Sequence, residues 1–289
     1  MTPIDPALLR TLPLPDHDSG ESKAARGAIL AVGGSLGVPG AILLTAVAAL
    51  RAGAGKLQIA TCASMGPQLG LLVPEALVVR LTETPAGGID PAAAGLDERL
   101  AAADAVVVGP GMDADAPALV AAVLAHRARP PLVIDAGGLR DLGAEGVRAR
   151  GGCVLTPDGD EAERLTGAAR EAVLDEPERV ARDAAARFGA VVALKGGSTV
   201  VAAPDGRTFR YAGGGVGLAT SGSGDTLAGI VGGLLARGAE PLTATLWGVW
   251  LHGEAGRRLA ARHGRLGFLA RELLAEVPRA MHEVSAGGG

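Results

Sequence analysis

Short apolar segments separated by longer, helix-like segments run through most of the sequence. Each short segment is a nearly uninterrupted run of apolar residues rather than an alternation of apolar and polar ones. Strands of a parallel sheet that is covered on both faces have this pattern, because both of their faces are buried. The predicted strands are residues 28–32, 57–60, 76–81, 105–108, 132–134, 153–155 and 191–194.

Predicted helices lie between these strands, which indicates an α/β protein with a three-layer α/β/α fold and a mostly parallel central sheet. Residues 199–203 and 208–212 flank a Pro-Asp-Gly turn and predict an antiparallel hairpin at one end of the sheet. We expect an N-terminal lead over residues 1–25 and a single domain over residues 26–285. The predicted helices are residues 40–52, 92–103, 117–128, 159–166 and 177–188, with 225–236 and 242–261 closing the domain.

Composition favours a folded protein that acts on small molecules. Hydrophobic residues make up 48% of the chain, which excludes disorder as its overall state. A net charge of −4 and few aromatic residues argue against nucleic-acid binding, and no apolar run is long enough to cross a membrane. The first twenty residues contain Asp5, Asp16 and Asp18 and no secretory leader pattern, so we expect a cytoplasmic location. Cys62 and Cys153 lack CxxC spacing and are interpreted as buried apolar residues.

Glycine-rich loops follow several of the predicted strands. In a parallel sheet, ligands bind at the carboxyl ends of the strands, so these loops are the candidate binding segments. None has the GxGxxG spacing of a dinucleotide-binding loop or the GxxxxGK[ST] pattern of a P-loop. The loops are residues 33–40, 109–111, 137–138, 196–197 and 220–225.

The loop at residues 220–225, Thr-Ser-Gly-Ser-Gly-Asp, is the strongest local indication of an anion site. Gly222 and Gly224 allow backbone N–H groups to converge, and the helix that follows adds its positive end. Asp225 has two interpretations at this level. It is either the N-cap of the helix or a general base that accepts a proton from a hydroxyl aimed at a bound phosphate.

Two further loops carry charged residues at the same edge of the predicted sheet. Lys195, one of only three lysines, ends a strand beside the amides of residues 196–199, which suits a nucleotide phosphate, although a solvated lysine in a plain turn fits as well. Residues 156–161, Thr-Pro-Asp-Gly-Asp-Glu, place carboxylates before a helix. These carboxylates either complement the helix dipole or form an edge of the site that binds magnesium and substrate, with Glu161 binding the metal through water.

Several of these motifs occur together in one family. They are Gly33-Gly34-Ser35 through Pro39-Gly40-Ala41, Arg51 to Gly55, Gly109-Pro110-Gly111, Asp135-Ala136, Thr156-Pro157, Lys195-Gly196 and Ser223-Gly224-Asp225. In combination they resemble the ADP/ATP-dependent NAD(P)H-hydrate dehydratases of the ribokinase-like superfamily, over about residues 25–275. Gly-Asp before a helix is common to the superfamily, whereas the combination of the first three motifs is specific to this family.

The resemblance implies a nucleotide-repair lyase that uses ADP, or ATP in some members, with Mg²⁺. The nucleotide would phosphorylate the ring hydroxyl of the S epimer of hydrated NADH or NADPH (NADHX or NADPHX), and loss of phosphate would restore the reduced nicotinamide. In this reaction Asp225 would be the general base. The implied site residues are Ala41, Gly111, Asp158 and Asp225 for the hydrate, and Lys195, Gly196, Gly197, Ser198, Thr199, Gly222, Ser223 and Gly224 for the adenine nucleotide.

One position departs from the family pattern. Asp158 stands where a substrate-contacting histidine is usual, and a carboxylate accepts hydrogen bonds where an imidazole can donate one. The departure predicts altered affinity for the hydrate or an altered substrate. Two other functions share the remaining features, namely a ribokinase-like kinase acting on a vitamin or sugar hydroxyl and a non-catalytic adenine-nucleotide-binding protein.

The resemblance also implies partners. Relatives often carry an epimerase domain at the N-terminus, and the first predicted strand begins near residue 28, so we expect a separate epimerase. Family resemblance further implies a homotetramer.

Overall fold

All seven predicted strands and the predicted hairpin are present in the structure, a computed structural model in which residues 1–16, 22–113 and 115–285 are described. One strand, at the N-terminus, was not predicted. The strands are β1 (Thr2–Pro3), β2 (Ala28–Val32), β3 (Lys56–Cys62), β4 (Ala76–Leu81), β5 (Ala105–Val108), β6 (Leu132–Ile134), β7 (Cys153–Leu155), β8 (Val191–Leu194), β9 (Thr199–Ala202) and β10 (Thr208–Tyr211).

These strands form one sheet in the order β1-β10-β9-β8-β7-β6-β5-β2-β3-β4. Strands β2 to β8 are parallel to their neighbours within that group, whereas β9 pairs antiparallel with both β8 and β10. The order reverses between β2 and β5, because the chain first proceeds outward to β4 and then returns to β5. Ligands of open α/β sheets bind at such a switch point, outside the carboxyl ends of the strands.

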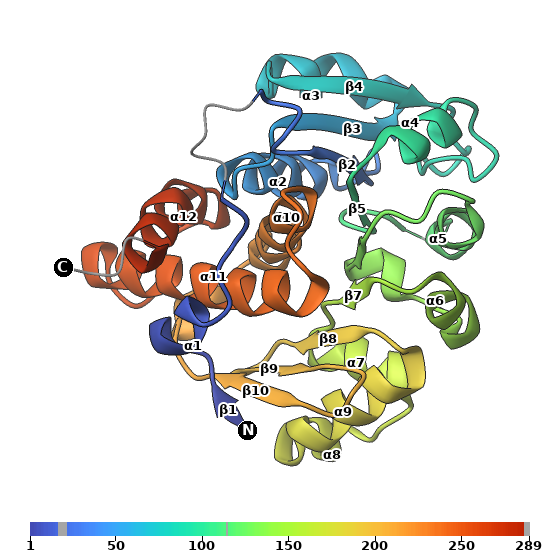
Figure 1. Cartoon of the computed structure of the whole chain (residues 1–289). Helices are drawn as coiled ribbons and strands as arrows, with labels where there is room; N and C mark the ends of the chain where they lie inside the picture. The colour runs from blue at the N-terminus through green and yellow to red at the C-terminus, as the bar shows by residue number, and fades with distance from the viewer. Residues whose placement is uncertain (17–21, 114, 286–289) are drawn as a thin grey trace.

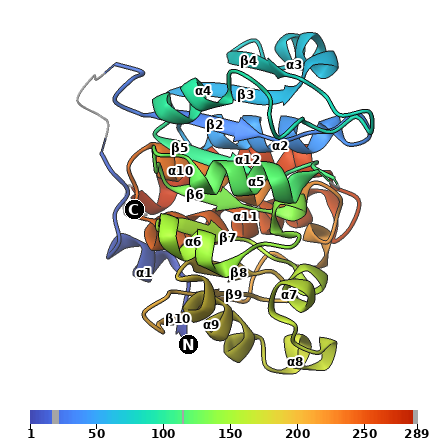
Figure 2. The same cartoon turned by 90° about the vertical axis from the view of Figure 1, so that its right-hand side faces the viewer.

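Helices cover both faces of the sheet, which confirms the three-layer α/β/α prediction (Figure 1). Figure 2 shows α4, α5 and α6 on one side of the sheet and α10, α11 and α12 behind it. The helices are α1 (Pro6–Arg10), α2 (Pro39–Arg51), α3 (Gly66–Leu72), α4 (Leu96–Ala102), α5 (Ala116–Ala125), α6 (Ala144–Arg150), α7 (Gly159–Thr166), α8 (Arg170–Asp175), α9 (Pro177–Phe188), α10 (Ser223–Ala236), α11 (Pro241–His263) and α12 (Ala270–Ser285), with 3₁₀ turns η1 (Ala63–Met65), η2 (Ala136–Leu139) and η3 (Val216–Leu218).

Two expectations about the helices were wrong. The domain does not close with α11, because α12 follows and packs against α11 and α2. Pro278 lies inside α12, and a proline in that position argues against a helix when only the sequence is read. The helix predicted at residues 92–103 is shorter, because Gly95 adopts a left-handed φ of 92° and α4 begins only after it.

The first sixteen residues of the expected lead pack against the sheet domain. Strand β1 pairs with β10, and Ile4 and Leu9 are buried in the main hydrophobic core. The Nε1 atom of Trp247 donates a hydrogen bond of 2.8 Å to the carbonyl of Leu12. This part of the N-terminal segment therefore packs on the sheet domain. Residues 17–21 of the expected lead, including Asp18, lie outside the described residues.

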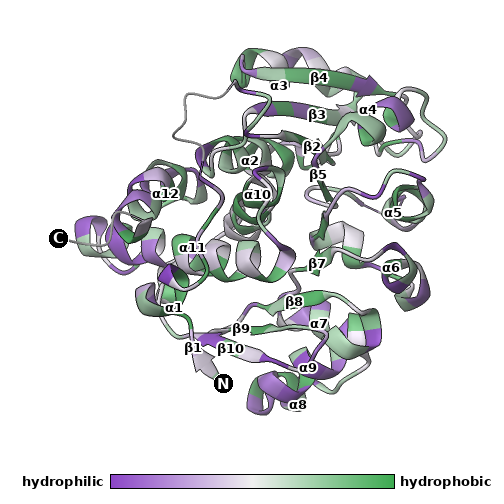
Figure 3. Cartoon of the chain, viewed as in Figure 1, coloured by the Kyte–Doolittle hydropathy of each residue, from purple (hydrophilic) through white to green (hydrophobic). Residues whose placement is uncertain are grey.

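The apolar residues of the strands alternate between two cores, one on each face of the sheet. Ile29 and Ala31 of β2 belong to the core under α2, α10 and α11, whereas Leu30 and Val32 belong to the core under α4 to α9. Figure 3 shows the strands as mainly hydrophobic and the outer helix faces as hydrophilic. The uninterrupted apolar runs of the sequence are thus explained by burial on both faces.

Helix α10 is held against α2 by glycines that bring the two backbones close together. A Cβ atom at Gly229 would lie 2.2 Å from the carbonyl oxygen of Thr45, and one at Gly233 would lie 2.4 Å from that of Ala49. The Thr45 hydroxyl adds hydrogen bonds of 3.1 Å to the carbonyls of Ala41 and Asp225. The first turn of α10 is therefore fixed relative to the start of α2.

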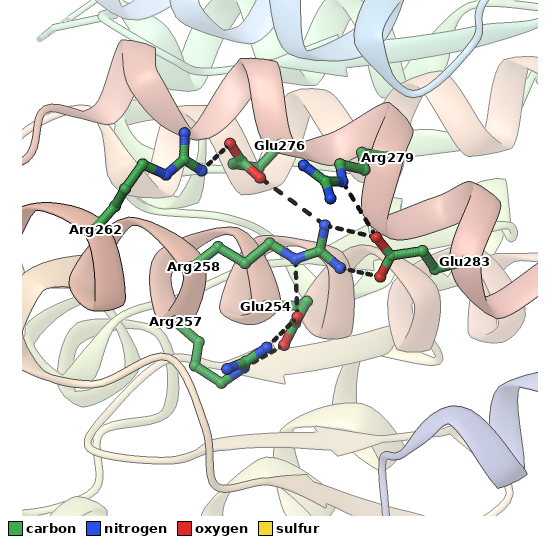
Figure 4. Close-up of polar contacts among 7 residues, drawn as sticks. All are labelled: Glu254, Arg257, Arg258, Arg262, Glu276, Arg279 and Glu283. Carbon is green, nitrogen blue, oxygen red and sulfur yellow. Dashed lines mark hydrogen bonds and ion pairs between the residues drawn. The ribbon is translucent and has the colours of Figure 1, made fainter. Parts of the chain in front are cut away.

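Arg258 and Arg262 of α11 form ion pairs with Glu276 and Glu283 of α12, and Glu254 pairs with arginines within α11. Glu254 accepts hydrogen bonds of 2.7 and 2.9 Å from Arg257 and Arg258, and Glu276 pairs with Arg262 (Figure 4). Burial alone would raise the pKa of Glu254, but the hydrogen bonds from the two arginines outweigh it and lower the pKa. The pairs that cross between the two helices hold α12 against α11.

Cys62 and Cys153 are both buried and unpaired, which confirms their interpretation as apolar residues. Burial raises the pKa of the Cys153 thiol to about 11, so it is not a reactive thiolate at neutral pH. None of the helices in the described ranges combines the length and apolarity that a membrane crossing requires.

Candidate functional site

A pocket of about 750 Å³ lies where the carboxyl ends of β6, β7 and β8 meet the N-terminus of α10. It brings together most of the residues expected to bind the nucleotide, although they come from two segments that are far apart in the sequence. The predicted site residues among its lining are Asp158, Glu161, Lys195, Gly196, Gly197, Thr199, Gly222, Ser223, Gly224 and Asp225.

The N-terminus of α10 forms one wall of this pocket. Gly222 occupies the N-cap position with a φ of 87°, and Asp225 is the third residue of the helix. The interpretation of Asp225 as an N-cap is therefore wrong. A side chain at Gly222 would also collide with Leu44, since its Cβ would lie 2.4 Å from the Leu44 Cδ1 atom. Glycine is required there by both conformation and space.

Lys195 lies opposite this helix terminus within a group of carboxylates. Its Nζ atom is 3.0 Å from Asp135 Oδ1 and 3.7 Å from Glu161 Oε2. A Cβ at Gly224 would lie 3.0 Å from the same Nζ atom, so the ammonium group reaches the first turn of α10. The neighbouring carboxylates raise the pKa of Lys195 against the effect of burial, which keeps the side chain charged. The alternative of a freely solvated lysine is wrong.

Asp225 carries the largest resolved carboxylate shift in this group. Burial, with like-charge repulsion from Asp135 and Glu161, raises the pKa of Asp225 to about 6 against the opposing effect of Lys195. A carboxylate with a pKa near 6 is still ionised at neutral pH and is a stronger base than an ordinary aspartate. Asp225 is therefore suited to accept a proton from a hydroxyl group.

Asp158 has a defined structural role. Its Oδ1 atom accepts a 2.8 Å hydrogen bond from the Glu161 amide, and the Glu161 carboxylate accepts one of 2.8 Å from the Asp158 amide. This capping box begins α7. The capping box supports a role of these carboxylates at the helix end, and the side chain of Asp158 remains exposed at the rim of the pocket, so the magnesium and substrate edge stays a prediction.

Ala41 and Gly111 lie outside the lining of this pocket but next to each other. A Cβ at Gly111 would lie 3.0 Å from that of Ala41, and the Gly34 amide donates a 2.8 Å hydrogen bond to the Pro110 carbonyl. The loops after β2 and β5 therefore meet at the switch point of the sheet. Thr45 links this point to Asp225 through its bonds to the carbonyls of Ala41 and Asp225.

Ser198 is separated from the other nucleotide residues. It lines an adjoining pocket of about 960 Å³ on the side of the hairpin loop that faces α8 and α9. Its hydroxyl accepts a 3.1 Å hydrogen bond from Arg210 Nε. Lys195, Gly196 and Gly197 line both pockets, so the loop forms the wall between them.

Known proteins are similar to this chain in sequence and in fold. The sequence matches the NAD(P)H-hydrate dehydratase family over residues 29–279. It is 46% identical over 290 residues to the ADP-dependent (S)-NAD(P)H-hydrate dehydratase of Xanthomonas campestris, covering 98% of this chain and 97% of the relative.

The chain belongs to the NAD(P)H-hydrate dehydratase family.

A second relative is longer than this chain, and a third has a solved structure. The chain is 38% identical to the bifunctional NAD(P)H-hydrate repair enzyme Nnr of Moorella thermoacetica over 92% of its own length, but it spans only 51% of that protein. The ADP/ATP-dependent NAD(P)H-hydrate dehydratase of Bacillus subtilis, co-crystallised with ATP and Mg²⁺, superposes with a TM-score of 0.84 at 30% identity, covering 98% of both chains. The dehydratase fold is ribokinase-like, as the resemblance implied.

Three residues of the dehydratase pocket were not assigned a role from the sequence. Asp135, which is almost fully buried, accepts hydrogen bonds from Thr156 and Lys195 on the same oxygen, at 2.7 and 3.0 Å. His252 lies 2.9 Å from the Ser223 hydroxyl, and burial and Lys195 lower its pKa to about 4, so it is neutral. Tyr211 also lines the pocket. The only signals that the sequence offers for the latter two are a lone histidine at the end of an apolar stretch of residues and the single tyrosine of the chain.

The dehydratase offers no preformed cage for a metal ion. Among the described residues, no group of three or more histidine, cysteine, aspartate or glutamate side chains is arranged to hold one. Mg²⁺ commonly binds through one or two carboxylates together with phosphate oxygens and water. This arrangement fits a metal ion that binds together with the nucleotide better than a metal ion held by the protein alone.

Proposed function

We propose that this chain is an ADP-dependent dehydratase of the S epimer of hydrated NADH and NADPH. The observation that carries the proposal is the placement of Asp225 beside the Lys195 ammonium group and the amides at the start of α10. One pocket thus offers an anion site and a carboxylate whose pKa is raised to about 6. Family membership and the name of the Xanthomonas campestris relative support the assignment.

In this proposal the two substrates meet at Asp225. The phosphates of the adenine nucleotide bind at the N-terminus of α10 and beside Lys195, where helix dipole and ammonium both favour negative charge. The hydrate binds over Ala41 and Gly111, at the switch point of the sheet, with Asp158 at its rim. The Thr45 link between α2 and α10 keeps these two regions in a fixed relation.

The chemistry proceeds in two steps. The ring hydroxyl oxygen attacks the terminal phosphorus of ADP, AMP departs, and the hydroxyl proton passes to Asp225. The carbon–oxygen bond of the phosphorylated hydrate then breaks, phosphate leaves with the electron pair, and the ring nitrogen supplies electrons. Loss of a proton from the adjacent carbon restores the double bond. Phosphorylation is needed because hydroxide is a poor leaving group.

The proposal also covers the metal ion and the phosphoryl donor. When bound, Mg²⁺ would neutralise phosphate charge, with Glu161 of the pocket lining able to hold it through water. We propose ADP as the usual donor, on the name of the Xanthomonas campestris relative. The ATP and Mg²⁺ in the crystals of the Bacillus subtilis enzyme support ATP as a second donor.

Product analysis separates this function from its rivals. Purified protein is incubated with hydrated NADPH and ADP, and the absorbance of reduced nicotinamide, AMP and phosphate are followed. A dehydratase regenerates NADPH and releases AMP and phosphate together. A ribokinase-like kinase of vitamins or sugars would instead leave a stable phosphorylated product, and a nucleotide-binding protein would leave all reactants unchanged.

The assembly and partners are also proposals. We propose a cytoplasmic homotetramer that works with a separate epimerase, which supplies the S epimer. Exposed Leu71 and Leu72 beside the edge strand β4 support self-association, with 85% and 64% of their surface accessible. The bifunctional relative supports the pairing of two repair activities. Light scattering tests the tetramer, and a monomeric mass would contradict it.

Activity should fall at acidic pH because Asp225 must be ionised to accept a proton. With a pKa of about 6, kcat/KM should drop about tenfold per pH unit below that value and level off above it. The His252→Gln variant is the control, because a histidine with a pKa of about 4 cannot produce this limb and the limb should persist without it. A profile that stays flat down to pH 5 would show that Asp225 is not the base.

Asp158 should weaken hydrate binding through its negative charge. Asp158→Asn keeps the capping oxygen but removes the charge, so the KM for hydrated NADPH should fall by about 2- to 5-fold. Asp158→His should lower KM as well, but with a loss of about 1 kcal/mol in the free energy of unfolding from the weaker cap. A rise in KM for both variants would show that Asp158 is an adapted ligand of the substrate.

A further inference from the structure

Tyr211 occupies a slot made of two glycines at one end of the pocket. It is the only tyrosine of the chain and the last residue of β10. A Cβ at Gly253 of α11 would lie 2.0 Å from the Tyr211 Cε1 atom, and a Cβ at Gly213 would lie 2.4 Å from its hydroxyl oxygen. The edge of the ring thus packs against the backbones of Gly213 and Gly253, and the side chain is half-buried and lines the pocket.

The surroundings of Tyr211 make this end of the pocket apolar. Leu218 lies in the same region, because a Cβ at Gly214 would approach both the Leu218 side chain and the Gly253 backbone, at 2.5 and 3.4 Å. Val216 lines the pocket with 53% of its surface exposed. Burial, reinforced by Glu254, raises the pKa of Tyr211 to about 12, so the ring is uncharged. An exposed apolar wall inside a pocket favours an apolar, flat ligand group.

Helix α11 connects this apolar end to the anion site. His252 contacts the Ser223 hydroxyl at the start of α10, and the next residue, Gly253, contacts the Tyr211 ring. A ligand with charged groups at Ser223 and Gly224 can therefore extend along α11 toward Tyr211. A nucleoside diphosphate fits this arrangement, because it has phosphates at one end and an aromatic base at the other.

We propose that Tyr211 is a specificity-determining residue that contacts the nucleobase of the phosphoryl donor by stacking. The proposal rests on the proposed function, since it assumes that the phosphates bind at α10. Aromatic side chains stack on purines through their faces. The glycine slot fixes the ring before the nucleotide arrives, so little side-chain freedom is lost on binding.

The test compares ligands with and without a base. The dissociation constants of ADP and of inorganic pyrophosphate are measured by calorimetry for wild type, Tyr211→Phe and Tyr211→Ala. ADP binding should weaken by about 5- to 100-fold in Tyr211→Ala and by less than about 2-fold in Tyr211→Phe, which keeps the ring. Pyrophosphate binding should be unchanged in both variants, because it has no base to stack.

Two results would overturn the proposal. One is ADP binding by Tyr211→Ala within about 2-fold of wild type, and the other is equal weakening of ADP and pyrophosphate, which would assign Tyr211 a structural role. If Tyr211→Ala fails to fold, Tyr211→Leu fills the glycine slot without an aromatic face, and the same predictions apply to it. Because the measurement is of binding, a protein that binds ADP through Tyr211 without turning over the hydrate would contradict the proposed function alone.

Discussion

Replacing Asp225 with asparagine should lower kcat by about 10²- to 10⁴-fold, the usual contribution of a general base, while ADP still binds. An amide keeps the shape of the side chain but cannot accept the hydroxyl proton. Stability should not fall, because Asp225 is not the N-cap of α10. Its pKa is raised from 3.8 to about 6 by folding, so above that pH the ionised carboxylate opposes the folded state, and removing its charge relieves this cost.

Steady-state kinetics and calorimetric ADP titration of the Asp225→Asn variant check this result. Asp183→Asn is a matched control, because Asp183 is a solvent-exposed carboxylate of α9, 60% accessible, and should retain wild-type turnover. If Asp225→Asn kept more than about a tenth of the wild-type kcat, the assignment of Asp225 as the base would be wrong.

Lys195→Ala should have the second largest effect, and it should appear in two parameters. The KM for ADP should rise by about 10- to 100-fold, because a charge-assisted contact to phosphate is lost. The acidic limb of the pH profile should also move to higher pH. Asp135 and Glu161 raise the pKa of Asp225 and Lys195 lowers it, so removal of the lysine leaves the repulsion unopposed.

Two further variants sharpen the Lys195 prediction. Lys56→Ala removes an exposed lysine at the start of β3 and should change neither parameter. Lys195→Arg keeps the charge but places a larger planar group within 3.0 Å of Asp135 and close to Gly224, so it should restore ADP binding only in part. An unchanged KM for ADP in Lys195→Ala, with normal stability, would remove Lys195 from the nucleotide site.

The sheet could be predicted from the sequence because burial on both faces leaves a distinct pattern. Runs such as residues 28–32 and 105–108 are apolar throughout, and the structure places both in the centre of the sheet. Helix α12 was not predicted, since Pro278 argues against it locally, and its packing against α11 and α2 stabilises it. Local patterns do not report such tertiary stabilisation.

The candidate site was predictable where chemistry depends on a loop motif and unpredictable where it depends on distant partners. Asp225 lies in the first turn of α10 and Lys195 directly follows β8, and glycine-rich loop motifs mark both positions in the sequence. Their proximity, and the shared role of Asp135, arise from the pairing order of β6, β7 and β8. His252 meets Ser223 across 29 positions of sequence, a contact that no local pattern encodes.

The transfer of the substrate oxygen to phosphate tests the central claim most directly. Hydrated NADPH is prepared with ¹⁸O in its ring hydroxyl and incubated with the protein and ADP, and the released phosphate is analysed by mass spectrometry. If the hydroxyl oxygen attacks phosphorus and the carbon–oxygen bond then breaks, each regenerated NADPH should yield one phosphate carrying ¹⁸O. Label in water and unlabelled phosphate would show that the hydroxyl is expelled without phosphorylation and would contradict the mechanism built on Asp225.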